Sequence, residues 1–198
     1  MANVGVSTKD GISGYLKVYI TQGDTTVVGY IAEGASKTLS SNWTSPFESD
    51  TLGSTGGGSK AAGIAQSLQS GEGEGKLTTV SQHNSVMVWE GTSPPTLNLP
   101  VYFQAYADAK LEVEDAIQAL ERFASPELNA YMPLGRSPQL VVIDVGRRFK
   151  ILNALLTEVT SELDAPRTSE GYMIRNAVNL TVTPDRMVNA SELQSMYP

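Results

Sequence analysis

Residues 86–140 read VMVWEGTSPPTLNLPVYFQAYADAKLEVEDAIQALERFASPELNAYMPLGRSPQL, and they hold the clearest strand pattern of the chain running directly into its clearest helix pattern. In LNLPVYF, apolar side chains alternate with others, which is the period of a half-buried strand. Pro100 cannot donate to a ladder, so it predicts an edge strand or a bulge at this point. The expected core residues of this strand are Leu97, Leu99, Val101 and Phe103.

One amphipathic helix is predicted directly after this strand, over about residues 108–124. Asp108 can accept hydrogen bonds from the free N–H groups of a helix start, and Pro126 disfavours helical backbone at the residue before it. Apolar residues between these limits recur at spacings of three and four, while acidic residues such as Glu112 fall on a solvated face. The side chains that we expect to pack on the core are Leu111, Val113, Ala116, Ile117, Leu120 and Phe123.

Strands are also predicted before this unit. Residues 14–33 alternate like a hairpin with a turn at Gly23, and residues 77–90 resemble another strand pair in which Val88 and Trp89 are available for burial.

Further strands are predicted after the helix. LVVIDV, residues 140–145, is a β-branched strand that ends at a glycine. FKILNALLTEVTSEL, residues 149–163, fits a helix or a strand bent at Asn153, and we assign it as a strand. YMIRNAVNLTV, residues 172–182, alternates clearly, and the tail after it is expected to form a short helix or a contact. The expected core residues of this last strand are Ile174, Val178, Leu180 and Val182.

The segment of residues 34–76 differs from the rest because Gly, Ser and Thr dominate it. Such a long segment without a clear pattern is normally functional or disordered until bound. It fits an arm that orders against a neighbouring subunit, or a surface loop. We therefore expect a single domain over residues 1–198 that carries this segment as an insertion or arm. Its predicted class is mainly β, an antiparallel sandwich or barrel with one packed helix.

The composition excludes several classes of protein. The 198 residues contain no cysteine and one histidine, and the net charge is −7. The missing cysteines exclude disulfides and thiolate metal sites. The acidic balance argues against a protein that grips nucleic acid, because phosphate binding requires clustered Lys and Arg. Without a signal peptide or an apolar run that could span a bilayer, we expect a soluble chain that does not bind membranes by itself.

The sequence offers no constellation for catalysis. His83 is the single histidine, and its neighbours Ser81 and Ser85 lie in a predicted strand rather than on a strained turn. The glycines of LGSTGGGSK, residues 52–60, have the spacing of a phosphate-binding loop, but Ser59 stands where the lysine must be. We therefore expect no catalytic, cofactor-binding or metal-binding residues and no enzymatic activity. Possible subunit contacts are Trp43, Phe47 and the adjacent basic pair Arg147 and Arg148.

An ordered series of features between residues 86 and 182 resembles the tube-forming baseplate proteins of contractile-tailed bacteriophages. The features are Trp89-Glu90-Gly91-Thr92, the apolar strand from Leu97 to Phe103, the helix start Ala107-Asp108-Ala109, the helix end Ser125-Pro126, and Val145-Gly146. The resemblance implies the fold of phage tail-tube and type VI secretion tube proteins, with six copies joined edge to edge in a ring whose lumen conducts DNA.

The same resemblance implies the function, partners and location. The implied function is tube initiation or hub formation at the baseplate. The implied partners are other copies of this chain in a homo-hexameric ring and adjacent tail-tube and baseplate proteins, with genomic DNA as passing cargo. The implied location is the virion, after assembly in the host cytoplasm.

Three other functions stay open at this point. A principal tail-tube or secretion-tube subunit would form long tubes by itself. A monomeric β-sandwich that binds carbohydrate or a cell surface would use exposed aromatic residues, with Tyr15, Tyr19, Tyr30 and Trp43 as the candidates. An enzyme would have to depend on His83.

Overall fold

The computed structural model describes residues 2–7, 9–44, 87–127 and 135–197. They fall into two units, of which one joins Met1–Ser40 to Pro94–Pro198 and the other is Ser41–Ser93. The second unit is therefore inserted in the sequence of the first. Most of the 34–76 segment, the first strand expected within residues 77–90, and both Phe47 and His83 lie outside the described residues.

The first unit contains both strands and helices. Its strands are β1 (Ala2–Gly5), β2 (Lys17–Gln22), β3 (Thr25–Ile31), β4 (Ser36–Thr38), β7 (Thr96–Gln104), β8 (Val141–Val145), β9 (Phe149–Ser161) and β10 (Arg175–Pro184). Its helical segments are η1 (Gly14–Leu16), η3 (Lys110–Glu114), α2 (Asp115–Ala124) and α3 (Ala190–Ser195).

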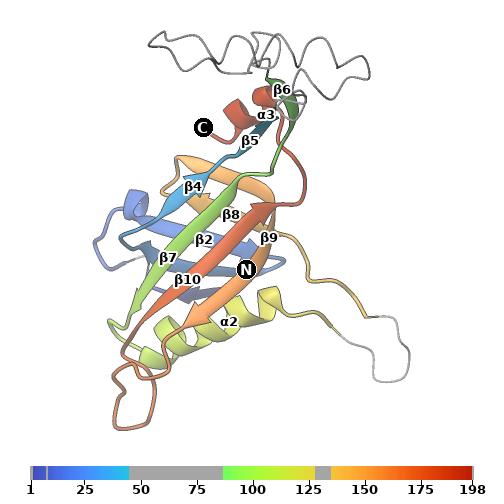
Figure 1. Ribbon diagram of the computed structural model, residues 1–198. Helices are drawn as coiled ribbons and strands as arrows, with labels where there is room; N and C mark the ends of the chain where they lie inside the picture. Colours follow the sequence, from blue (N-terminus) through green and yellow to red (C-terminus); the bar gives the residue numbers. More distant parts are fainter. Residues whose placement is uncertain (1, 8, 45–86, 128–134, 198) are drawn as a thin grey trace, which may run out of the picture. The chain divides into compact units, whose positions relative to one another are not determined.

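A closed β-barrel forms the centre of this unit (Figure 1). The wall follows the order β3-β2-β8-β9-β10-β7, and the pairing of β3 with β7 closes it. All neighbours in this ring of six strands are antiparallel. The predicted class, mainly β with one packed helix, is confirmed. The 14–33 hairpin is confirmed as β2 and β3, and the ambiguous 149–163 stretch is the long strand β9.

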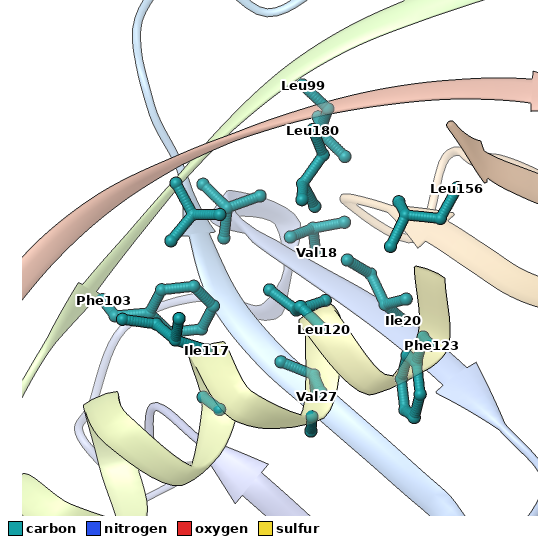
Figure 2. Close-up of a cluster of buried hydrophobic side chains, with 14 of the residues drawn as sticks. Val18, Ile20, Val27, Leu99, Phe103, Ile117, Leu120, Phe123, Leu156 and Leu180 are labelled. Carbon is teal, nitrogen blue, oxygen red and sulfur yellow. The ribbon is translucent and has the colours of Figure 1, made fainter. Parts of the chain in front are cut away.

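Helix α2 packs its apolar stripe on the barrel core. Asp108 caps the helical region as predicted, since its Oδ1 accepts from the Lys110 N–H at 3.0 Å. Figure 2 shows Leu120 and Phe123 among side chains from the barrel strands. The first helical turn is a π-turn, which the sequence did not predict. The buried apolar residues of the helical region are Val113, Ala116, Ile117, Ala119, Leu120 and Phe123.

The prediction that Leu111 packs on the core was wrong. Its side chain is 44% exposed, whereas Leu120 is fully buried. Leu111 lies in the π-turn, Lys110–Glu114, whose backbone does not keep the 3.6-residue period of α2. Leu111 therefore faces away from the stripe that Leu120 defines.

Strand β7 is not an edge, and its register with β10 runs through Pro100 without a bulge, so both interpretations of Pro100 were wrong. β7 pairs with β10 along one side and with β3 and β4 along the other. The Pro100 carbonyl accepts from the Ala32 N–H at 3.0 Å, so the ring nitrogen of Pro100 also faces the chain between β3 and β4. The ladder with β7 is interrupted there. The missing N–H of proline therefore falls where β7 changes its partner strand.

The predicted alternation fails at the start of β10. Ile174 was expected in the core but is 39% exposed, and the neighbouring Met173 is buried instead. Ile174 precedes the strand, and its N–H donates to the Pro166 carbonyl at 2.8 Å, which fixes it in the loop before β10. The other predicted core residues of β10 and β7 are buried, namely Val178, Leu180, Val182, Leu97, Leu99, Val101 and Phe103.

The second unit contains an antiparallel pair, β5 (Ser41–Thr44) and β6 (Val88–Thr92). Trp43 lies opposite Trp89, and the Trp89 indole donates to the Ser41 hydroxyl at 3.2 Å. Val88 and Trp89 are 44% and 51% exposed, so the expected burial of these two residues was wrong. A two-stranded ribbon has too little apolar area of its own to cover them.

Candidate interaction surfaces

The basic pair Arg147 and Arg148 lies at the exposed turn between β8 and β9. Gly146 and Arg147 both have positive φ, at 59° and 52°. Glycine adopts such backbone freely, but a side chain such as that of Arg147 does so rarely. A Cβ at position 146 would lie 2.6 Å from the Tyr15 carbonyl oxygen, and the Gly146 N–H donates to the Lys17 carbonyl at 2.9 Å. The turn is therefore held closely against the start of β2.

Two tyrosines position these arginines. The Arg147 guanidinium carbon lies 5.0 Å from the centre of the Tyr19 ring, and that of Arg148 lies 5.8 Å from the Tyr15 ring. The neighbouring Tyr19 hydroxyl raises the pKa of Arg147 above its ordinary value. Among the described residues, no carboxylate forms an ion pair with either arginine. Two oriented positive charges are thus presented to solvent, as the prediction of a subunit contact requires.

Of the other predicted contacts, Phe47 lies outside the described residues. Trp43 is 54% exposed and belongs to the second unit. Of the aromatic residues considered for a carbohydrate site, Tyr19 and Tyr15 each have an arginine guanidinium next to the ring. Tyr30 is half-buried, and its hydroxyl donates to Asp10. Tyr30 therefore does not form an open platform with Tyr15 and Tyr19.

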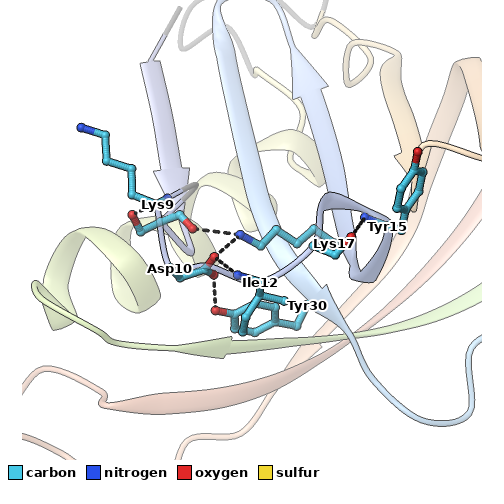
Figure 3. A network of polar contacts seen from close by, with 8 residues as sticks. Lys9, Asp10, Ile12, Tyr15, Lys17 and Tyr30 are labelled. Atoms are coloured by element: carbon cyan, nitrogen blue, oxygen red, sulfur yellow. Dashed lines mark hydrogen bonds and ion pairs between the residues drawn. The ribbon is translucent and has the colours of Figure 1, made fainter.

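A buried polar cluster fastens the N-terminal segment to the outside of the β2–β3 hairpin (Figure 3). The Lys17 ammonium lies 2.6 Å from Asp10 Oδ1 and donates to the Ser7 carbonyl at 3.0 Å. Asp10 Oδ1 also accepts from the Ile12 N–H at 2.9 Å. The side chains of Lys17 and Asp10 are only 2% and 4% exposed. Because these groups bond to one another and are closed to solvent, the cluster is suited to holding the fold rather than to binding a substrate.

The cluster shifts the pKa values of its members in opposite directions. Burial raises the pKa of Tyr30, and the hydrogen bond to the Asp10 carboxylate raises it further. Burial also opposes ionisation of Asp10, but the hydrogen bonds from Lys17 and Tyr30 outweigh it and lower the pKa of Asp10. Hydrogen bonds to a charged form favour that form. The cluster therefore holds Asp10 ionised and Tyr30 neutral.

Two further buried polar residues position loops of the barrel. The Glu112 carboxylate, placed on the solvated face by the sequence pattern, is 5% exposed and accepts from the N–H groups of Tyr106, Ala107 and Asp108. Asn176 is 1% exposed and bonds to both the N–H and the carbonyl of Glu162, at 3.1 and 2.7 Å. Neither role follows from the periodic pattern, because Glu112 accepts from N–H groups four to six residues before it and Asn176 bonds to backbone groups fourteen residues away.

The outward face of β7, β10 and the part of β9 paired with β10 is mainly uncharged. Its charged residues are Arg175 and Glu158, and Glu158 accepts from the Thr181 hydroxyl at 3.3 Å. The other outward positions are Thr96, Asn98, Pro100, Tyr102, Gln104, Ala177, Asn179, Thr181, Thr183, Leu155 and Thr160. Such a surface offers hydrogen-bonding groups without the basic clusters that hold phosphate.

Strands β1 and β4 leave open sheet edges. Within the described residues, β1 pairs only with β3, and β4 pairs only with β7. The N–H groups of Ala2 and Val6 donate toward β3, at 2.7 and 2.8 Å. Because successive N–H groups of a strand point in opposite directions, that of Asn3 faces the free edge. This edge can accept another strand.

Comparisons with known proteins do not assign the chain to a family. No protein-family model matches the sequence, and no curated protein matches it. In the part of the chain that the structure describes, no three acidic, histidine or cysteine side chains are grouped so that they could hold a metal ion. None of the described helices is long and apolar enough to cross a membrane.

Proposed function

We propose that this chain is a structural subunit of a phage tail that forms a hexameric ring of the tail tube at the baseplate end. The observation that carries this proposal is the closed antiparallel barrel with one helix packed on its core, because this is the architecture that the sequence resemblance implies. The ring would contact adjacent tail-tube and baseplate proteins in the virion and surround genomic DNA as passing cargo. No chemistry is required of the chain.

The open edges of β1 and β4 support assembly of copies into a ring. Unpaired N–H and C=O groups at a sheet edge favour pairing with another strand, and a closed ring leaves no edge unpaired. The mainly uncharged face of β7, β10 and β9 supports a channel wall. With a net charge of −7, such a wall would let a polyanion pass without holding it.

Electron microscopy of the purified chain over rising concentration, with solution mass measured in parallel, tests the proposal. Six-fold rings are the expected result. Long tubes formed by the chain alone would instead identify a principal tail-tube or secretion-tube subunit. A strict monomer at every concentration would contradict self-assembly and favour a binding module.

The variant Asn3→Pro tests whether the β1 edge joins the copies. Proline removes the outward N–H of Asn3 and leaves the inward bonds of Ala2 and Val6 in place. We expect this variant to fold but to lose its rings, whereas Asn3→Ala should keep them. Rings that persist in Asn3→Pro would show that copies do not join through this edge.

A further inference from the structure

A groove of about 780 Å³ lies where β7 passes into the helical region. One wall belongs to residues 105–110, and the other belongs to residues 168–174 in the loop before β10. Figure 1 shows both segments at the same end of the barrel. The Ala105 N–H donates to the Ile174 carbonyl at 2.8 Å and joins the two walls. The groove falls within the size range of small-ligand sites, roughly 300–1,000 Å³.

The first wall presents Tyr106, which is 80% exposed, from a fixed backbone. The buried Glu112 carboxylate accepts hydrogen bonds from the N–H groups of residues 106–108. Single exposed apolar residues are common on protein surfaces, but here a buried charge holds the backbone of the exposed ring in place. A surface that is ordered before binding loses less conformational entropy when a ligand arrives. The Tyr106 ring is therefore suited to serve as a stacking platform.

The second wall is also held by hydrogen bonds. The Thr168 N–H donates to the Tyr172 carbonyl at 2.8 Å, and the Tyr172 N–H donates to the Thr168 hydroxyl at 3.2 Å. Between these two residues, the exposed Ser169 and Glu170 line the groove. The Lys110 ammonium of the first wall lies 6.0 Å from the centre of the Tyr172 ring, so it reaches across to the second wall. Both walls thus supply positioned polar groups.

The charges of the groove do not match a phosphate. The charged side chains among its described lining residues are those of Asp108, Lys110 and Glu170, so two carboxylates stand against one ammonium group. Asp108 Oδ1 also occupies N–H groups of the helix start, since it accepts from Lys110 and Leu111 at 3.0 and 3.3 Å. An anionic ligand would therefore meet net repulsion.

The same groups match a neutral saccharide. A sugar ring combines hydroxyl groups at its edge with an apolar C–H face, and it carries no charge. Carboxylates accept hydrogen bonds from hydroxyl groups, and such charge-assisted bonds are roughly twice as strong as neutral ones. A lysine ammonium donates to the oxygen atoms of the sugar, and a tyrosine ring packs against its C–H face.

We infer that this groove binds a short neutral saccharide, with one sugar ring stacked on Tyr106 and its hydroxyl groups bonded to Glu170 and Lys110. The inference goes beyond the proposed ring, because it concerns a ligand that each copy recognises by itself and needs no contact between copies. The groove is also distinct from the carbohydrate site considered from the sequence, which used other aromatic residues.

Saccharide binding by the full chain tests the inference. The probes are an array of neutral oligosaccharides of glucose, galactose, mannose and N-acetylglucosamine, with oligogalacturonate as the acidic comparison. We expect binding of at least one neutral oligosaccharide and none of oligogalacturonate. In calorimetric titration of that neutral ligand, Tyr106→Ala should weaken binding about tenfold or more, because it removes the stacking surface.

Two tyrosine variants serve as matched controls. Tyr106→Phe keeps the ring, so its affinity should stay within about threefold of the wild type. Tyr15→Ala makes the same truncation at a tyrosine that is 61% exposed and lies outside the groove, so its affinity should not change. Solution mass and urea unfolding confirm that the compared proteins have the same oligomeric state and fold.

The carboxylate of the second wall is tested in the same titration. Glu170→Gln keeps the shape of the side chain and removes its charge, so binding should weaken about fivefold or more. Glu121→Gln is the control, because Glu121 is an exposed glutamate of α2 that does not line the groove.

The outcomes separate this inference from the proposed ring. Neutral-saccharide binding that Tyr106→Ala loses and both tyrosine controls keep supports the groove. Binding that is unchanged in Tyr106→Ala and Glu170→Gln overturns it, as does an array on which no neutral saccharide binds or oligogalacturonate binds best. Rings without saccharide binding overturn this inference alone, and a monomer that binds the saccharide overturns the ring alone.

Discussion

The two faces of the β2–β3 hairpin are both buried, but different partners bury them. The inward face presents Val18 and Ile20 to the core that α2 covers, and apolar contact alone is enough there. The outward face presents Lys17 and Tyr30, which the N-terminal segment covers through Asp10. An apolar face can accept any surface of suitable shape, whereas a buried charge needs one specific partner. Loss of a single partner should therefore have different consequences on the two faces.

The largest effect is expected on the inward side. Leu120→Ala should lower the free energy of unfolding by about 4 kcal/mol, because a fully buried leucine leaves a cavity. Leu111→Ala is the matched control on the same helical region, and its exposed side chain should make the change about 0.5 kcal/mol. Urea unfolding of both variants measures the difference. Similar losses in the two variants would contradict the assignment of the buried stripe.

On the outward side, the stability lost when Asp10 is replaced should depend on whether Lys17 is still present. Asp10→Ala should cost about 3 kcal/mol, because it leaves the Lys17 ammonium buried without its counter-charge. Adding Lys17→Met should recover part of this loss, since the second change removes the unpaired charge. The measurement is a double-mutant cycle in urea. If the stability lost in the double variant equals the sum of the losses in the two single variants, the two groups do not interact.

The pH dependence of stability follows from the same pair. The pKa of Asp10 is lowered in the folded chain, so its stabilisation is present above its unfolded pKa of about 3.9 and is lost as the pH falls through the folded pKa. The pKa of Tyr30 is raised, so its contribution is present below about pH 10 and is lost as the pH rises through the folded pKa. The stability of Asp10→Asn should vary less between about pH 2 and 4 than that of the wild type.

A smaller effect is expected at Glu112, which combines features of both faces. It lies beside the apolar stripe, but its carboxylate accepts three backbone N–H groups. Glu112→Gln keeps the shape and removes the charge, so the expected loss is about 1.5 kcal/mol. The exposed Glu121→Gln should change stability by about 0.5 kcal/mol or less. Thermal unfolding compares the two, and equal stability would mean that the Glu112 charge contributes nothing to its three bonds.

The sequence alone determined the elements whose residues repeat with a regular period. The alternation in β7 and β10 and the three-four spacing of α2 identified strands, a helix and most of the core, because side chains of one element that share a face follow its geometry. The sequence also predicted the adjacent arginines as a subunit contact, and the structure shows both of them exposed.

Only the tertiary structure decided what depends on partners outside the periodic elements. Pro100 fits an interior strand because the partner of β7 changes there from β3 to β4, so the ladder does not need an N–H from residue 100. Ile174 is exposed because Pro166 holds it in a loop, and Glu112 is buried because three N–H groups just before the helix need an acceptor. Local periodicity contains no information about such partners, since each is supplied by another element.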